Sequence, residues 1–161
     1  MCYFLLWFVV SVIAVCQDHR ARFAIVKVID GDTVSINVSS FMPPPLNTTM
    51  SVRVRGVDTP ESGSRAQCPE EALLASAATA FTQSMVARYE PLNTGIRICG
   101  WDKYGGRVLG DIVFWDDDGS TTVLSVCLLR TGHAVEYSGH GLKNDWCAHE
   151  TGYAFTAKKI P

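Results

Sequence analysis

The fold of this chain is decided by the stretch Val28-Ile29-Asp30-Gly31-Asp32-Thr33-Val34. Runs of β-branched and apolar residues flank its Asp-Gly pair at positions 23–29 and 33–38, and this arrangement is a strong signal for a β-hairpin. The sequence therefore predicts two antiparallel strands, with the carboxylate of Asp32 at their turn.

A third strand is predicted at residues 50–57, where the side chains alternate in character. Val52 and Val54 would face the core, and Arg53 and Arg55 would face the opposite side, because successive side chains of a strand point to opposite faces. Two guanidinium groups would therefore share one face of the sheet.

A long helix is predicted to begin at Pro69-Glu70-Glu71, since proline suits the first turn of a helix and acidic residues suit its positive end. Apolar residues recur after this start at helical spacing, which is typical of a face packed against a core. The predicted core face consists of Leu73, Ala77, Phe81 and Met85.

Two further strands are predicted at 96–99 and 107–115, joined by a turn that contains Lys103-Tyr104-Gly105-Gly106. A short helix capped by Ser125 and a terminal helix at 145–157 would follow. The order β-β-β-α-β-β-α predicts the α+β class, as a five-stranded β-barrel with flanking helices. The inward side chains of the last strand would be Val108, Ile112 and Phe114.

Length and composition indicate one folded domain. The chain has 161 residues, of which 47% are hydrophobic and 19% are charged. This composition excludes a disordered protein, and the length suits a single core. The formal net charge of -2 excludes attraction to polyanions over the whole surface, so contact with nucleic acid would need a local basic cluster.

The first 16 residues carry no charged side chain, and the run ends at Gln17-Asp18-His19-Arg20. Such a run is typical of a secretory signal peptide. A membrane anchor is the alternative, although the run is shorter than the roughly 20 residues that span a bilayer. We therefore expect residues 1–16 to be a signal peptide or hydrophobic segment and residues 22–161 to form the domain. The protein would be secreted or periplasmic, without a stable membrane partner.

Four cysteines follow this segment, and they allow three pairings that the sequence cannot choose among. Cys68 and Cys147 flank polar segments near the ends of elements, so they are the favoured disulfide pair. Cys99 lies in a predicted strand and Cys127 in a predicted helix. We expect both of these residues to be small buried thiols.

Two carboxylates are expected to meet at one end of the sheet, because Asp32 closes the hairpin and Asp58 ends the third strand. Neighbouring carboxylates are stabilised in the charged form by a cation between them. Together with the main-chain carbonyl of Thr59, they would form an all-oxygen site, which favours calcium or magnesium over zinc.

Glu61 follows Pro60, whose fixed φ stiffens the turn, so its carboxylate is a candidate general base. Arg53 and Arg107 are candidates for binding phosphate, which prefers the planar fork of arginine to a point charge. The alternatives are an exposed loop glutamate and arginines engaged in surface ion pairs, which contribute little energy.

Three segments together resemble the signature stretches of the staphylococcal nuclease (thermonuclease) family, in the order that the family has them. They are residues 28–34, residues 52–61 and the stretch Asp102-Lys103-Tyr104-Gly105-Gly106-Arg107. The resemblance implies an OB-fold-like barrel with flanking helices. It also implies a calcium-dependent nuclease that cleaves DNA and RNA with little sequence preference and leaves 3'-phosphate ends.

The resemblance also implies a role for each matching residue. Asp32, Asp58 and Thr59 would bind Ca2+, Glu61 would activate water, and Arg53 and Arg107 would bind and stabilise the scissile phosphate. Residues near the nucleotide would be Arg55, Lys103, Tyr104 and Tyr137, and an aromatic ring there could stack on a base. The extra glycine before Arg107 departs from the shortest form of the motif.

Two other classes of function remain open at this point. The same barrel could bind nucleic acid without cutting it, because one fold hosts many functions. A structural secreted domain could use its acidic residues only to bind calcium, although this would leave Arg53 and Arg107 unexplained. We expect a monomeric enzyme that prefers single-stranded DNA and RNA.

Overall fold

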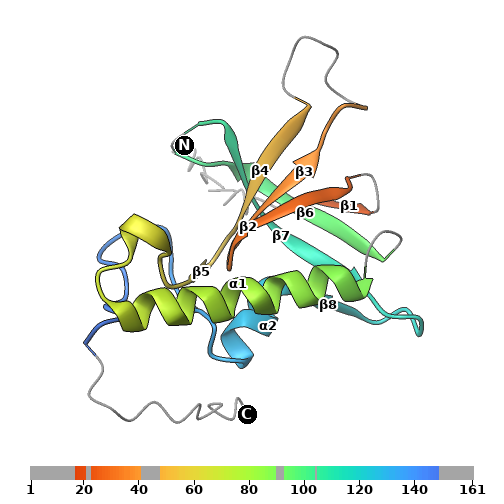
Figure 1. Ribbon diagram of the computed structural model, residues 1–161. Coiled ribbons are helices and arrows are strands. Elements are labelled where there is room, and N and C mark those ends of the chain that lie inside the picture. Colours follow the sequence, from red (N-terminus) through yellow and green to blue (C-terminus); the bar gives the residue numbers. More distant parts are fainter. Residues whose placement is uncertain (1–16, 21–22, 41–47, 90–92, 104, 149–161) are drawn as a thin grey trace, which may run out of the picture.

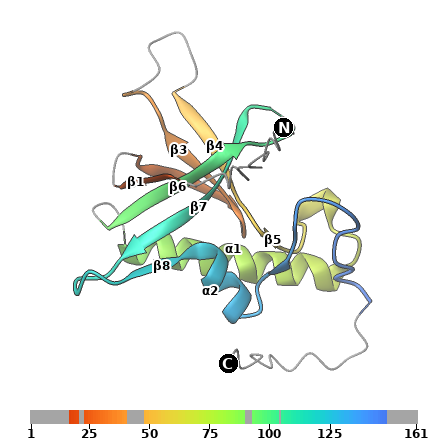
Figure 2. The ribbon, with the colours of Figure 1, turned by 180° about the vertical axis from the view of Figure 1, so that it is seen from behind.

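The structure is a computed structural model that describes residues 17–20, 23–40, 48–89, 93–103 and 105–148. In these ranges the chain forms a seven-stranded sheet, a separate two-stranded sheet, two α-helices and one 3-10 helix (Figures 1 and 2). The mixed α+β class predicted from the sequence is therefore confirmed.

The large sheet contains most of the strands. They are β1 Gln17–Arg20, β2 Ile25–Asp30, β3 Thr33–Asn37, β4 Thr49–Val54, β6 Thr94–Trp101, β7 Arg107–Trp115 and β8 Thr121–Val123. The small sheet pairs β5 Val57–Asp58 with β9 Val135–Glu136. The helices are α1 Pro69–Tyr89, α2 Leu124–Arg130 and the 3-10 helix η1 Gly63–Arg65. The hairpin, the long helix and the two later strands are confirmed. The third strand is shorter than predicted, because β4 ends at Val54 and Asp58 lies in β5 of the small sheet; β1, β5, β8 and β9 were not predicted.

The large sheet follows the order β1-β6-β7-β4-β3-β2, with β8 paired to β7. All neighbours are antiparallel except β4 and β7, which run parallel. Because the order starts at β1 and ends at β2, the sheet formed by the described residues is open. The closed five-stranded barrel expected from the sequence is therefore not shown.

The core lies on one face of this sheet and is made mostly of β-branched residues. Val52 and Val54 are buried as the alternation predicted, and so are Val108, Ile112 and Phe114. Arg53 lies beside Thr33 of β3 and Leu109 of β7. The strands thus place the side chain of Arg53 on the face opposite the valines.

Helix α1 lies across one end of the sheet (Figure 1). The prediction of its core face was wrong at Leu73 and Ala77, which are exposed, whereas Phe81 and Met85 are half-buried and pack against the core as predicted. Leu73 is 72% exposed. The buried residues are Glu71, Ala75, Ala78, Thr82 and Val86. Small side chains face the sheet because the helix passes very close to the hairpin turn: the Thr82 hydroxyl donates a 2.6 Å hydrogen bond to the carbonyl of Gly31.

Gly31→Ala is expected to destabilise the protein, since a Cβ atom at this position would lie 2.8 Å from the Cβ of Ala78. Such overpacking costs about 1–3 kcal/mol of the free energy of unfolding, which urea denaturation measures. The control is the same change in an Ala78→Gly background, where the contacting methyl group is gone and the cost should shrink. Equal costs in both backgrounds would contradict this account.

The C-terminal half differs from the prediction in two places. Ser125 does not cap α2, because its hydroxyl and its N–H both donate to the carboxylate of Asp111. Residues 145–148 form a turn in which the backbone N–H groups of Cys147 and Ala148 donate to Asp145, and the rest of the predicted terminal helix lies outside the described residues.

The predicted signal segment, residues 1–16, also lies outside the described residues. None of the described helices is long and apolar enough to cross a membrane.

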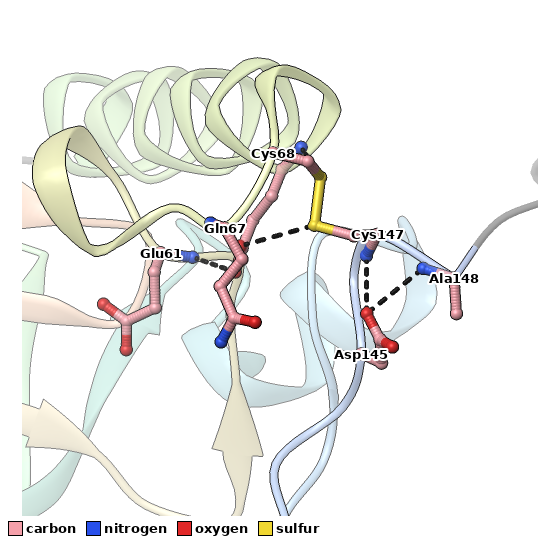
Figure 3. The surroundings of a disulfide bond; sticks show 7 residues. Glu61, Gln67, Cys68, Asp145, Cys147 and Ala148 are labelled. Atoms are coloured by element: carbon pink, nitrogen blue, oxygen red, sulfur yellow. Dashed lines mark hydrogen bonds between the residues drawn. A yellow bond between two sulfur atoms is a disulfide. The ribbon is translucent and has the colours of Figure 1, made fainter.

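A disulfide bond joins Cys68 to Cys147, as the sequence analysis favoured (Figure 3). It ties the chain after β9 to the residue that precedes α1. Cys127 is a half-buried free thiol. Cys99, however, is disulfide-bonded, so the prediction of a buried thiol at this position was wrong.

Candidate active site

The predicted residues meet at a cleft with a volume of about 530 Å³. It is bordered by β4, the loop after β5, the turn between β6 and β7, and the chain after β9. The predicted residues that line it are Arg53, Arg55, Glu61, Lys103, Arg107 and Tyr137. Tyr104 lies outside the described residues.

Asp32 and Asp58 lie behind this surface and are 0% and 1% exposed. They are brought together because the end of β4 pairs with the hairpin turn, where the N–H of Val54 donates to the carbonyl of Asp32. The guanidinium group of Arg53 contacts both carboxylates. The N–H of Thr59 donates a 3.2 Å hydrogen bond to the second oxygen of Asp32, so the predicted ligands form one cluster.

The electrostatics of Asp32 indicate a site that needs positive charge. The pKa of Asp32 is raised from 3.8 to about 7, because burial raises this pKa by more than the neighbouring charge of Arg53 lowers it. A carboxylate in this environment gains stability from a close cation. The charge of Arg53 alone does not offset the cost of burying Asp32.

The raised pKa of Asp32 predicts how stability depends on pH. Because the folded state binds this proton more tightly than the unfolded state, the contribution to stability is complete below about pH 4 and is lost as the pH rises through about 7. With chelator present, the free energy of unfolding should fall over this range in urea titrations. Asp32→Asn should flatten the fall, and an unchanged pH dependence in this variant would contradict the assignment.

The donor atoms present fit a hard cation such as calcium. Among the described residues, no group of three His, Cys, Asp or Glu side chains converges as it would around a bound metal. Asp32 and Asp58 nevertheless supply buried carboxylates, and calcium accepts main-chain oxygens, water and phosphate at its other positions. A softer metal would require nitrogen or sulfur ligands that this cluster does not contain.

Glu61 lies on the loop between β5 and η1, and three contacts fix it. Its backbone N–H donates a 3.0 Å hydrogen bond to Glu71 of α1, and its carboxylate pairs with Arg65 at 2.9 Å and with Lys143 at 2.7 Å. Burial raises the pKa of Glu61, but the hydrogen bond from Lys143 and the nearby cations outweigh it and hold the pKa below its ordinary value. Glu61 is therefore held as a carboxylate, the form that accepts a proton.

Arg107 begins β7, where its Cα atom is paired with that of Ser51 on β4. Because Arg53 is two residues further along β4, both arginine side chains project from the same face of the sheet into the cleft. Asp102 accepts a 2.6 Å hydrogen bond from Nε of Arg107. This contact holds the guanidinium group at the wall of the cleft.

Several functional contacts were missed by the sequence analysis. Arg65 follows Glu61 at a spacing of four residues, a signal that could have been found. Glu71 was interpreted only as an acid at a helix N-terminus, yet it is buried and holds the loop of Glu61. Lys143 contacts Glu61 across 82 positions of sequence, and no local pattern predicts such a contact.

Comparison with known families agrees with this geometry. Residues 51–159 match the family described as staphylococcal nuclease homologue. The matched range begins after Asp32 and includes Arg53, Asp58, Glu61 and Arg107. A search of curated proteins found no match. Because the family match covers more than half of the 161 residues, the chain belongs to the staphylococcal nuclease homologue family.

Proposed function

We propose that this protein is a calcium-dependent phosphodiesterase that cleaves DNA and RNA without sequence preference and leaves 3'-phosphate ends. A domain of this family indicates a nuclease or a nucleic-acid-binding module. The observation that carries the choice of an enzyme is that Arg53 contacts the buried pair Asp32 and Asp58 and lines the same cleft as Glu61. A binding module would need the basic residues but would have no use for the carboxylate of Glu61.

In this proposal, Asp32 and Asp58, with the carbonyl of Thr59, hold the calcium ion. When bound, the ion supplies positive charge that favours attack on the phosphate and neutralises developing negative charge. Glu61 takes a proton from the attacking water as the new bond from oxygen to phosphorus forms. The bond from phosphorus to the 5'-oxygen breaks, and the leaving oxygen takes a proton from solvent.

Arg53 and Arg107 bind the oxygens of the phosphate that do not react. Their planar groups come from neighbouring strands, and each can donate two parallel hydrogen bonds as charge builds up. Asp32 and Asp102 hold the two groups in place before substrate arrives. Arg55, Lys103 and Tyr137 line the same cleft and would contact the flanking nucleotides, as would Tyr104.

We also propose that the protein is a secreted or periplasmic monomer. The disulfide between Cys68 and Cys147 supports an oxidising compartment, where such bonds persist. The uncharged run at residues 1–16 supports export.

The test is digestion of heat-denatured DNA, RNA and duplex DNA by the purified protein with calcium, with magnesium or with chelator. We expect cleavage with calcium, loss of cleavage with chelator, and faster cutting of single strands, which enter a narrow cleft more easily than a duplex. Labelling of the product ends should show 3'-phosphates. Binding of all three substrates without cleavage under any condition would favour the binding module.

A further inference from the structure

Lys143 lies between the proposed metal ligand Asp58 and the proposed base Glu61 and contacts both of them. Its Nζ atom lies 2.9 Å from Oδ1 of Asp58 and 2.7 Å from Oε1 of Glu61. A single ammonium group therefore contacts both a proposed metal ligand and the proposed base. Burial lowers the pKa of Lys143, but the hydrogen bonds to both carboxylates outweigh it and raise the pKa above its ordinary value.

The segment that carries Lys143 is fixed at both ends. The N–H of Tyr137 donates to the carbonyl of Gly56 at one end, and Cys147 is bonded to Cys68 at the other (Figure 3). Between them, Trp146 is buried. This segment lies beside η1 at the N-terminal end of α1 in both ribbon views (Figures 1 and 2). The position of Lys143 near Glu61 is therefore set by the fold.

A metal ion that binds Asp58 would have to displace Lys143 from this carboxylate. Oδ1 of Asp58 receives both Lys143 and the guanidinium group of Arg53. A carboxylate oxygen that already contacts two cationic groups has few free lone pairs for a metal ion. The positive charges of the lysine and the metal ion would also repel each other at this short range. The side chain of Lys143 is 44% exposed, and its flexible stem lets the ammonium group return to water.

We propose that Lys143 is a built-in cation of this site, which neutralises Asp58 and Glu61 and releases Asp58 when a divalent cation binds, so that it sets the metal affinity of the protein. This inference rests on the proposed function, in which Asp58 is a metal ligand. Removing the ammonium group should therefore strengthen metal binding.

The test is calorimetric titration of the full chain with calcium, supported by thermal unfolding with and without calcium. Lys143→Met keeps the apolar stem but removes the charge, Lys143→Arg keeps the charge, and Lys27→Met makes the same change at an exposed position of β2. If Lys143 occupies Asp58 in nine of ten molecules, Lys143→Met should bind calcium about tenfold more tightly. Its melting temperature should be lower than that of wild type with chelator and should rise more on adding calcium.

The outcomes separate this inference from the proposed function. Tighter binding in Lys143→Met, with Lys143→Arg and Lys27→Met close to wild type, supports the inference even if no variant cuts nucleic acid. Calcium affinity in Lys143→Met that is equal to or weaker than wild type overturns it. An equal gain in Lys27→Met also overturns it, because the effect would then be one of net charge. Absence of calcium binding in every variant overturns it as well, and whether nucleic acid is cut is decided separately by digestion.

Discussion

Glu61→Gln is expected to lower the rate of phosphodiester cleavage about a thousandfold, the middle of the range for loss of a general base. Glutamine has nearly the same shape and can still accept the hydrogen bond from Lys143, but it cannot take a proton from water. Oligonucleotide binding in the presence of calcium should remain close to that of wild type, because the phosphate is held by Arg53 and Arg107. Single-turnover cleavage and fluorescence anisotropy measure the two quantities.

The control for this prediction is Glu70→Gln, which makes the same change of charge at an exposed position in the first turn of α1. It should cut at the wild-type rate. Stability should change little in either variant, because half-exposed ion pairs contribute little. Loss of both cutting and binding in Glu61→Gln would show that Glu61 has a structural role and would contradict the proposed chemistry.

The sheet could be predicted because its signals are local. Alternation along β4 placed Val52 and Val54 in the core and the two arginines outside, and the Asp-Gly pair located the hairpin. Short strands such as β5 and β9 carry no such pattern, since two residues are too few to show a period. β5 pairs with β9 only because the fold brings these two segments, which are far apart in the sequence, side by side.

Hydrophobicity predicted only part of the face that α1 packs against the core, namely Phe81 and Met85, because the space available also selects which residues are buried. The helix passes so close to Gly31 that alanine and threonine fit where larger residues do not. Leu73 therefore points away from the sheet although it is the more apolar residue. Sequence periodicity describes which side chains avoid water, but not how near the neighbouring backbone lies.

In the candidate site, too, some residues could be predicted from the sequence and others could not. Its acids and arginines lie in short motifs, so their types and spacing were sufficient to name them. The residues that orient them come from elsewhere: Glu71 holds the backbone of Glu61 from α1, and Lys143 reaches it from the chain after β9. Such partners are set by tertiary structure, and one sequence does not reveal them.

Arg107→Gln is expected to lower the cleavage rate about a hundredfold or more, which is the usual cost of removing one preorganised donor to a developing charge. The variant also removes the ion pair between Arg107 and the buried carboxylate of Asp102, so the free energy of unfolding should fall by about 1–3 kcal/mol. The double variant Asp102→Asn with Arg107→Gln separates the two effects. It should recover stability in urea denaturation while its cleavage rate stays low.

Arg55→Gln is the matched control for Arg107→Gln, because both arginines line the same cleft and the change removes the same charge. If Arg107 is the group that stabilises the reacting phosphate, Arg55→Gln should weaken substrate binding and leave the single-turnover rate at saturating substrate nearly unchanged. A fall in that rate as large as that of Arg107→Gln would show that Arg55 shares the role. In that case, Arg55 and Arg107 would both have to be assigned to the reacting phosphate.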